Sequence, residues 1–436
     1  MHRSNADSYA PRSGANRYRQ IVPLLAIVCL TLSPRPAFSQ SASDASQETM
    51  RLLTERIERL EKRLAEVEAK QSGSISGAND HAGPAVASVA QMPVAEEQLP
   101  LTREPHEHSM DIPGGPHLRI QGFSDVDYRA SNRSGETNSF ALGAFDLFVS
   151  SQVSEKFKML SEVNFEFGND NELAVDLERM LLTYSANDHF KLSFGRYHTA
   201  IGYYNTAFHH GTWFQTATGR PFLFFFEDEG GVLPVHNVGL SLTGSIPSGK
   251  LGINYIAEIG NGRPARRPQN TTVQNLVDEN NGKSFNLGMW MRPEWLSGLQ
   301  FGGSLYHDRL TADIPQGIQE YIPAIHAVYI TPKFEWLNEA VVIRHSLDGG
   351  RSFNTPGFYT QISRQWEVYR PYIRYQYINA SPLEPLLFDT GLQQGPSVGL
   401  RYDWSEFAAL KIQYDRALRS GLQDVNQLGL QMAFTF

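Results

Sequence analysis

The chain has almost no cysteine and no long hydrophobic run. Cys29 is the single cysteine among 436 residues, which excludes an intrachain disulfide and any site built from several thiolates. The longest apolar stretch, residues 21–32, is shorter than the about 20 residues that a transmembrane helix needs. Because the mean hydropathy is also −0.35, a helical membrane protein with several spans is excluded.

The chain also lacks an excess of positive charge. Its net charge is −8, whereas nucleic-acid-binding proteins usually carry a basic patch, so we expect no nucleic-acid partner. Aromatic residues are nevertheless abundant, at 11%. A chain that is rich in aromatics yet hydrophilic on average can form one large all-β unit around a polar interior.

The first 39 residues have the order of a secretory signal peptide. Four arginines precede the apolar run, and the small residues Ala37 and Ser39 stand before Gln40, where we expect cleavage. The alternative, an N-terminal membrane anchor, needs a longer apolar stretch. Cleavage removes Cys29 and more basic than acidic residues, so the exported chain has no cysteine and is more acidic still.

Residues 40–70 are expected to form a coiled-coil oligomerisation helix. Basic residues such as Arg56 and acidic residues such as Glu61 flank the seam where neighbouring chains of a parallel coiled coil attract each other. The alternative is a single amphipathic helix lying on a surface. Residues 71–116, rich in Gly, Ser, Ala and Pro, are expected to be a flexible linker. Within the predicted coiled-coil helix of residues 40–70, the apolar a and d positions of the heptads are Met50, Leu53, Ile57, Leu60, Leu64 and Val67.

From residue 117 to residue 436 the pattern has a period of two. In the last segment Leu428, Leu430 and Met432 alternate with Gln427, Gly429 and Gln431. Similar alternation recurs along the whole region and gives sixteen segments. One apolar and one polar face in each segment are typical of a transmembrane β-barrel, so the predicted fold class is all-β, a 16-stranded antiparallel transmembrane barrel.

The lengths of the connections favour the same fold. Short links at 153–156, 186–189, 247–250, 331–333 and 404–406 alternate with links that are mostly longer, at 130–138, 198–235, 261–282, 310–319, 346–356 and 380–395. Short turns at one end and long loops at the other are expected of a barrel that crosses an outer membrane. A soluble β-sandwich would not alternate in this way.

The signal peptide, the heptads, the sixteen strands and the terminal Phe436 together resemble a trimeric outer-membrane porin of Gram-negative bacteria, of the phosphate-selective porin O and P type. The resemblance implies a homo-oligomer, outer-membrane lipid and lipopolysaccharide as surroundings, and a linker and coiled coil in the periplasm, where the N-terminal region can contact the cell wall. It also implies that Phe436 is part of the signal read by the barrel-assembly machinery.

The third long loop, residues 198–235, is the candidate constriction, because the third loop of such porins folds into the lumen. Its many aromatic residues can pack against the inner wall, and Glu227, Asp228 and Glu229 form an acidic group. The histidines here match no ligand spacing, so no metal site is expected. Because no catalytic or phosphate-binding motif was found, we expect no cofactor and no enzymatic activity.

Charge placement suggests how a pore could select its solutes. Acids fall on the early strands and bases on the late ones, which predicts a negative and a positive wall. The alternative is that these side chains are solvated and have no collective role. The expected pore-lining residues are Arg119, Arg129, Asp146, Glu162, Glu166, Glu178, Arg196, Arg220, Glu227, Asp228, Glu229, Arg374, Arg401 and Lys411.

These observations predict an outer-membrane porin for passive diffusion of ions and small polar solutes, including anionic nutrients such as phosphate. Phosphate-selective porins line their channels with many bases, whereas acids outnumber bases in residues 117–436. The basic stretch that begins at Arg263 could attract anions or lipopolysaccharide. The alternative function is a barrel-anchored structural or cell-wall-tethering surface protein without a conducting pore.

Overall fold

A computed structural model describes residues 108–110, 117–167, 173–208, 211–227, 230–263, 276–278, 280–310 and 317–436. The predictions for residues 1–39 and 40–70, and most of those for 71–116, lie outside these ranges. A three-residue strand, β1 (His108–Met110), falls within the expected linker and pairs with the first long strand.

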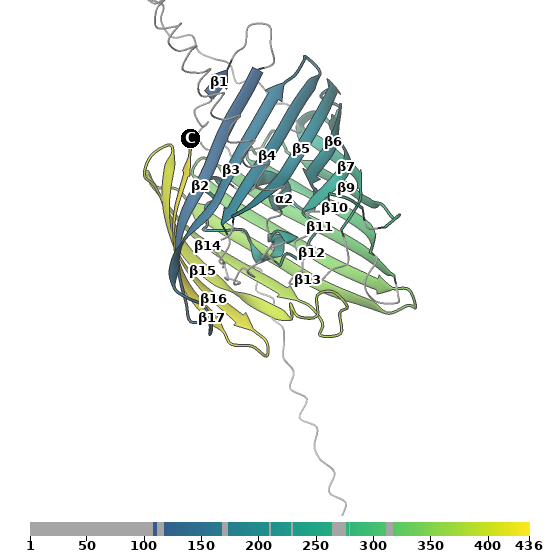
Figure 1. The fold of residues 1–436 in the computed structure, drawn as a ribbon. Coiled ribbons are helices and arrows are strands. Elements are labelled where there is room, and N and C mark those ends of the chain that lie inside the picture. Colours follow the sequence, from purple (N-terminus) through teal and green to yellow (C-terminus); the bar gives the residue numbers. More distant parts are fainter. Residues whose placement is uncertain are drawn as a thin grey trace, which may run out of the picture.

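Sixteen long antiparallel strands make up most of the described structure (Figure 1). They are β2 (His117–Ser131), β3 (Ser139–Gln152), β4 (Phe157–Phe167), β5 (Leu173–Asn187), β6 (Phe190–His198), β7 (His236–Ile246), β8 (Ile253–Gly260), β9 (Ser284–Met291), β10 (Leu299–Leu310), β11 (Ile318–Thr331), β12 (Phe334–Leu347), β13 (Ser352–Arg364), β14 (Tyr369–Asn379), β15 (Leu392–Asp403), β16 (Ala408–Arg419) and β17 (Val425–Thr435). The predicted number of strands is confirmed.

Each long strand pairs with the next one along the chain, and the last pairs with the first. β17 lies antiparallel to β2, with Leu430 opposite Tyr128, so the sheet closes into a barrel that has no free edge. Among the described residues, no helix is long and apolar enough to cross a membrane.

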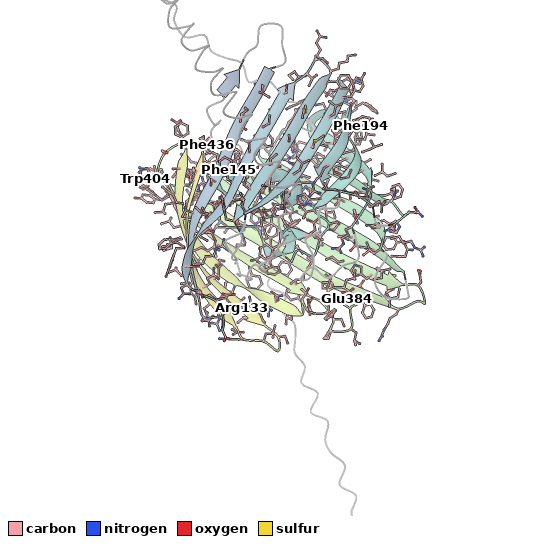
Figure 2. The ribbon with its side chains drawn as sticks, viewed as in Figure 1. Arg133, Phe145, Phe194, Glu384, Trp404 and Phe436 are labelled. Carbon is pink, nitrogen blue, oxygen red and sulfur yellow. The ribbon has the colours of Figure 1, made fainter. Side chains whose placement is uncertain are left out.

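The two ends of the barrel differ. One end, here called the turn end, carries the connections 153–156, 188–189, 247–252, 292–298, 332–333, 365–368 and 404–407. The other, here called the loop end, carries longer segments that include 199–235 and 380–391. Figure 2 shows Trp404 and Phe436 toward the turn end and Arg133 and Glu384 toward the loop end.

One predicted long link is short. The sequence predicts a loop over 346–356, but β12 and β13 are separated only by residues 348–351. Gly349 and Gly350 both adopt positive φ values, 137° and 93°, which allows a tight reversal there. Pro356 lies within β13, opposite Val342, so this proline does not end the strand.

Apolar side chains cover the outside of the barrel, while polar and charged side chains alternate with them toward the inside. On β16, Leu410, Ile412 and Tyr414 are exposed, whereas Lys411 and Gln413 are buried. Two polar residues on the outer face, Asn338 and Arg364, are accommodated locally. Asn338 donates to the Ala327 carbonyl, and the Arg364 guanidinium lies over the Trp366 ring.

Phe436 helps to close the barrel at the turn end. Its backbone exchanges two 3.0 Å hydrogen bonds with Gly122 of β2. The Phe436 ring stacks on Phe145 with a centroid distance of 5.8 Å and covers Gly122, where an added Cβ would lie 2.2 Å from the ring. The C-terminal residue is therefore held by both its backbone and its side chain.

Candidate functional site: a loop folded into the barrel

The described residues of the segment 199–235, called loop 3 below, lie inside the barrel. They contain the short helix α2 (Tyr204–Ala207) and the 3-10 turns η1 (Thr212–Phe214) and η2 (Phe222–Phe224). Figure 1 shows α2 enclosed by the strands. The loop thus occupies the space that a pore would use.

An apolar surface on the inner wall holds one side of loop 3. The inward positions of β11 and β12 carry aliphatic side chains such as Ile322, Leu337 and Val341, where a purely aqueous lumen would favour polar ones. Loop residues such as Leu223 and Phe224 are fully buried against this surface. Each such side chain contributes about 1.5–3 kcal/mol when it is buried, so the loop is firmly packed.

Three bases on the late strands hold the other side of loop 3. Arg374 on β14 donates to the Gly219 carbonyl at 2.9 and 2.7 Å. Arg401 on β15 donates to the carbonyls of Trp213 and Gln215 at 2.5 and 3.0 Å. Lys411 on β16 donates to those of Thr212 and Ala217 at 2.6 and 3.0 Å. All three bases are buried, and Arg401 also pairs with Asp403 at 2.7 Å, so these side chains bind the loop backbone.

Glu339 on β12 binds the start of α2. It accepts the backbone N–H groups of Tyr203 at 2.5 Å and Tyr204 at 2.9 Å, and the Tyr359 hydroxyl at 2.7 Å. Gly202 has a φ of 74°, and a Cβ there would lie 2.2 Å from the Glu339 carboxylate. Only a glycine therefore lets the backbone come this close.

Ionic contacts fix the C-terminal end of loop 3. His236, the first residue of β7, lies between Glu227 and Glu178, with Nδ1–Oε2 and Nε2–Oε2 distances of 2.9 and 2.6 Å. Glu227 also accepts the backbone N–H groups of Val235 and His236 at 2.6 and 2.8 Å. Burial alone would raise the pKa of Glu227, but these contacts with His236 outweigh it and lower the pKa below its ordinary value.

Two of the early acids lie beside arginines. Glu162 on β4 forms an ion pair with Arg179 on β5, and both side chains are buried. Arg196 on β6 donates Nε to the Glu178 carbonyl at 2.9 Å. Positive groups therefore lie among the acids of the expected negative wall.

The other predicted pore residues are distributed around this centre. Asp146 is buried, and Arg119 is exposed near the turn end. Arg129 pairs with Asp127 at 2.5 Å, and Glu166 accepts the Asn164 amide at 2.8 Å. Two further residues, Asp228 and Glu229, lie outside the described ranges.

Arg220 belongs to the interior of loop 3. It donates to the carbonyls of Phe224 at 2.5 Å and Phe208 at 3.0 Å, and its guanidinium lies 4.0 Å from the centre of the Phe226 ring. These contacts hold separate parts of the loop together, so Arg220 stabilises its shape.

A cavity of about 180 Å³ lies between loop 3 and the wall formed by β5–β11. Its charged lining residues are Arg179, Arg292 and Glu258. Glu258 accepts the Ala200 N–H at 3.0 Å. Arg292, in the turn after β9, donates Nε to Gln300 at 2.7 Å. The cavity therefore extends from loop 3 toward the turn end.

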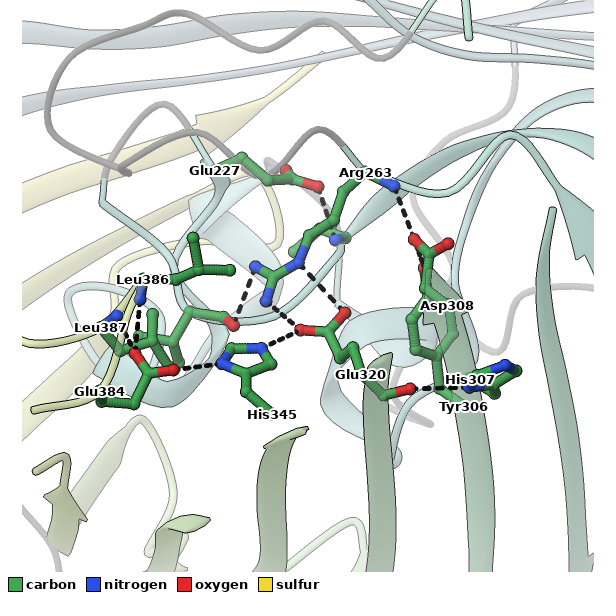
Figure 3. Close-up of polar contacts among 12 residues, drawn as sticks. Glu227, Arg263, Tyr306, His307, Asp308, Glu320, His345, Glu384, Leu386 and Leu387 are labelled. Atoms are coloured by element: carbon green, nitrogen blue, oxygen red, sulfur yellow. Dashed lines mark hydrogen bonds and ion pairs between the residues drawn. The ribbon is translucent and has the colours of Figure 1, made fainter. Parts of the chain in front are cut away.

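A network of buried charges ties the loops together at the loop end (Figure 3). Arg263 pairs with Glu320 on β11, donates its backbone N–H to Asp308 at 3.0 Å and donates NH1 to the Val232 carbonyl at 3.1 Å. Glu320 also contacts His345 on β12 at 2.9 Å. His345 contacts Glu384, which accepts the Leu386 N–H at 2.9 Å.

The position of Arg263 corrects one expectation from the sequence. The arginine was expected to lie in a surface loop that could attract anions or lipopolysaccharide, but it is buried and pairs with Glu320. Burial alone would lower the pKa of Arg263, yet the carboxylate of Glu320 raises it above its ordinary value. The remaining arginines of the stretch, at 266 and 267, lie outside the described ranges.

Sequence reasoning missed several residues that hold the site together. Arg179, His236, Glu339 and Glu320 are contacted by partners from distant parts of the chain. Inward parity in the strand pattern was the available signal for Glu320 and Glu339, and parity identifies a face but not a partner. Arg179 is buried next to the buried Glu178 because the β4–β5 pairing shifts register there, which alternation does not predict.

No protein-family profile matches this chain, and neither does any curated protein. Solved structures share its fold. An OmpF of Salmonella typhi, solved with daunomycin, has 12% identity and a TM-score of 0.53, over 75% of this chain and 100% of that one. The channel DcaP of Acinetobacter baumannii has 11% identity and a TM-score of 0.52, over 75% and 99%.

An anion-selective porin from Comamonas acidovorans has 12% identity and a TM-score of 0.52, over 74% of this chain and 100% of that one. At these identities the likeness concerns the fold alone. The three structures therefore support the barrel architecture described above.

Proposed function

We propose that this protein is a porin of a Gram-negative outer membrane, which lets ions and small polar solutes diffuse passively. The observation that carries the proposal is the closed barrel with an apolar outer surface and a loop fixed inside it. An apolar exterior suits lipid, and a polar interior suits water. The turn end then faces the periplasm.

We further propose a preference for small anions, phosphate among them. The cavity beside loop 3 carries two arginines and one carboxylate, and Arg374, Arg401 and Lys411 line the opposite side of the loop. Arg179 is paired with Glu162 and Arg401 with Asp403, so the proposal depends on the remaining bases, since positive side chains along a narrow passage favour anions. In a KCl gradient across a bilayer, the reversal potential should therefore have the sign of chloride permeation. The sign of potassium permeation would exclude the preference.

A structural surface protein without a conducting pore is the second candidate. It is favoured by the tight packing of loop 3 and by the network of Arg263, Glu320, His345 and Glu384, which draws three loops together at the loop end. This alternative keeps the barrel as an anchor and gives the interior only a structural role.

Purified protein in planar lipid bilayers separates the two candidates. A porin gives discrete, reproducible conductance steps, whereas a sealed anchor gives none although the protein inserts. Insertion is checked independently by protease protection in liposomes, so silence from inserted protein would exclude the porin.

We also propose that the chain catalyses no reaction, that it assembles as a trimer through its N-terminal heptads, and that Phe436 is read by the barrel-assembly machinery. The exposed ring of Phe436 at the turn end supports the last point, because a receptor can reach it there.

A further inference from the structure

The geometry points to a site for a divalent transition-metal ion at the base of loop 3, formed by Glu178, His198 and His236. One ligand atom of each residue lies within 4.8 Å of the others. All three side chains are buried, at 3%, 5% and 4% exposure. This departs from the expectation that the chain holds no metal.

The β-sheet brings these residues together although they are far apart in sequence. His198 ends β6 and His236 begins β7, and the two are direct partners in the ladder. Their rings are 5.0 Å apart, centre to centre. Glu178 lies on the neighbouring strand β5 and reaches Nε2 of His236 at 2.6 Å.

Both histidines are oriented by contacts through Nδ1. In His198, Nδ1 lies 3.1 Å from the Asn205 carbonyl, which can only accept, so Nδ1 carries the proton and Nε2 carries the lone pair. In His236, Nδ1 contacts Glu227. Histidines that bind metals are usually oriented in this way by a carbonyl or a carboxylate.

The main evidence for a bound ion at this site is the state of Nε2 of His198. This atom is buried and has no hydrogen-bond partner among the described residues. A buried polar atom without a partner costs about 1–3 kcal/mol. A metal ion placed between Glu178 and the two Nε2 atoms would satisfy it.

The charges suit a dication. Glu178 and Glu227 supply two negative charges at the site. The nearby cations have other contacts: Arg179 pairs with Glu162, and Arg220 binds loop carbonyls. The two carboxylates and a divalent ion therefore balance.

Two imidazoles and one carboxylate form a donor set typical of Zn²⁺, with water as the fourth ligand. Bonds of about 2.0–2.1 Å to a tetrahedral ion place donor atoms about 3.3 Å apart, so binding requires side-chain shifts of roughly 1 Å. His198 immediately precedes loop 3 and His236 immediately follows it. The ion would thus join the two ends of the inward loop.

The test is zinc binding by the full-length protein in detergent after treatment with EDTA. Equilibrium dialysis with ZnCl₂ should give one tightly bound zinc per chain. His198→Ala should weaken that binding by at least about 100-fold, and Glu227→Gln by about 10–100-fold, since it removes an orienting contact and one of the two negative charges but no ligand. The control His326→Ala changes a buried histidine of the cavity wall and should leave binding unchanged.

Two further measurements distinguish the loss of this site from misfolding of the barrel and from zinc binding by other histidines. Glu178→Gln preserves the shape of the side chain, and with Co²⁺ as probe it should lose the visible absorption bands of a four-coordinate ion while circular dichroism stays that of a barrel. If wild-type protein binds no stoichiometric zinc, or if His198→Ala binds it equally well, the site does not exist. Because these readouts do not involve conductance, their failure leaves the porin proposal unaffected.

Discussion

At the scale of single residues, the same side chain can face the lumen and still be engaged by the protein. Arg374, Arg401 and Lys411 lie on the inward faces that the strand pattern predicts, yet each donates to carbonyls of loop 3. Parity in a strand gives the direction of a side chain. It does not reveal that a loop 155 to 199 residues earlier in the chain will come to lie against it.

Lys411 tests whether these bases anchor the loop. Lys411→Met removes a buried donor from the carbonyls of Thr212 and Ala217, and an unpaired buried carbonyl costs about 1–3 kcal/mol. Loop 3 should become more mobile, so single-channel current should become noisier or larger.

The control for Lys411 is Lys333→Met, which changes an exposed lysine in a turn and should have no effect. A changed ion preference with undisturbed current noise would instead mean that Lys411 acts only as a pore-lining charge.

Gly122 tests the docking of the C-terminal residue. Gly122→Ala would place Cβ where the Phe436 ring lies, and overpacking of this kind costs about 1–3 kcal/mol. The folded barrel should therefore melt at a lower temperature, as measured by the heat-induced mobility shift in gel electrophoresis. Gly429→Ala is the matched control, because the nearest atoms there are 3.9 Å away. If both variants melt at the same temperature, the contact between Gly122 and the Phe436 ring contributes nothing to stability.

At the scale of elements, regular strands are predictable and their irregular connections less so. Period-two alternation predicts the sixteen strands because each strand has one side toward the outside of the barrel and one toward the interior. The link at 346–356 was predicted too long, since the positive φ values of Gly349 and Gly350 allow a tight reversal between β12 and β13. The zinc ligands were missed because their closeness depends on strand pairing.

The loop-end network tests whether loops narrow the mouth of the barrel. Glu384 holds residues 380–391 by accepting the Leu386 N–H and contacting His345. Glu384→Ala should release this loop and increase single-channel conductance. The control Leu383→Ala truncates an exposed side chain of the same loop and should not change it. Reduced conductance in Glu384→Ala would contradict this role.

At the scale of the whole molecule, the structure describes the barrel, whereas the N-terminal heptads lie outside the described residues. If residues 40–70 join the chains, a protein lacking residues 44–70 should be less oligomeric than the full chain. Light scattering in detergent measures this directly, with a deletion of equal length within the predicted linker, residues 71–116, as the control. Identical masses for the truncated and full chains would mean that the barrels assemble without the helix.

The central claim is that this barrel conducts and that loop 3 narrows it. Its most direct test is the single-channel conductance of the full chain and of a variant lacking residues 200–233, measured side by side in planar bilayers. Both proteins should give discrete steps, and the steps of the variant should be clearly larger, because the deletion removes most of the loop that fills the interior. The claim would be contradicted if the inserted full-length protein gave no conductance steps. It would also be contradicted if the full chain and the variant, both correctly folded, gave steps of equal conductance.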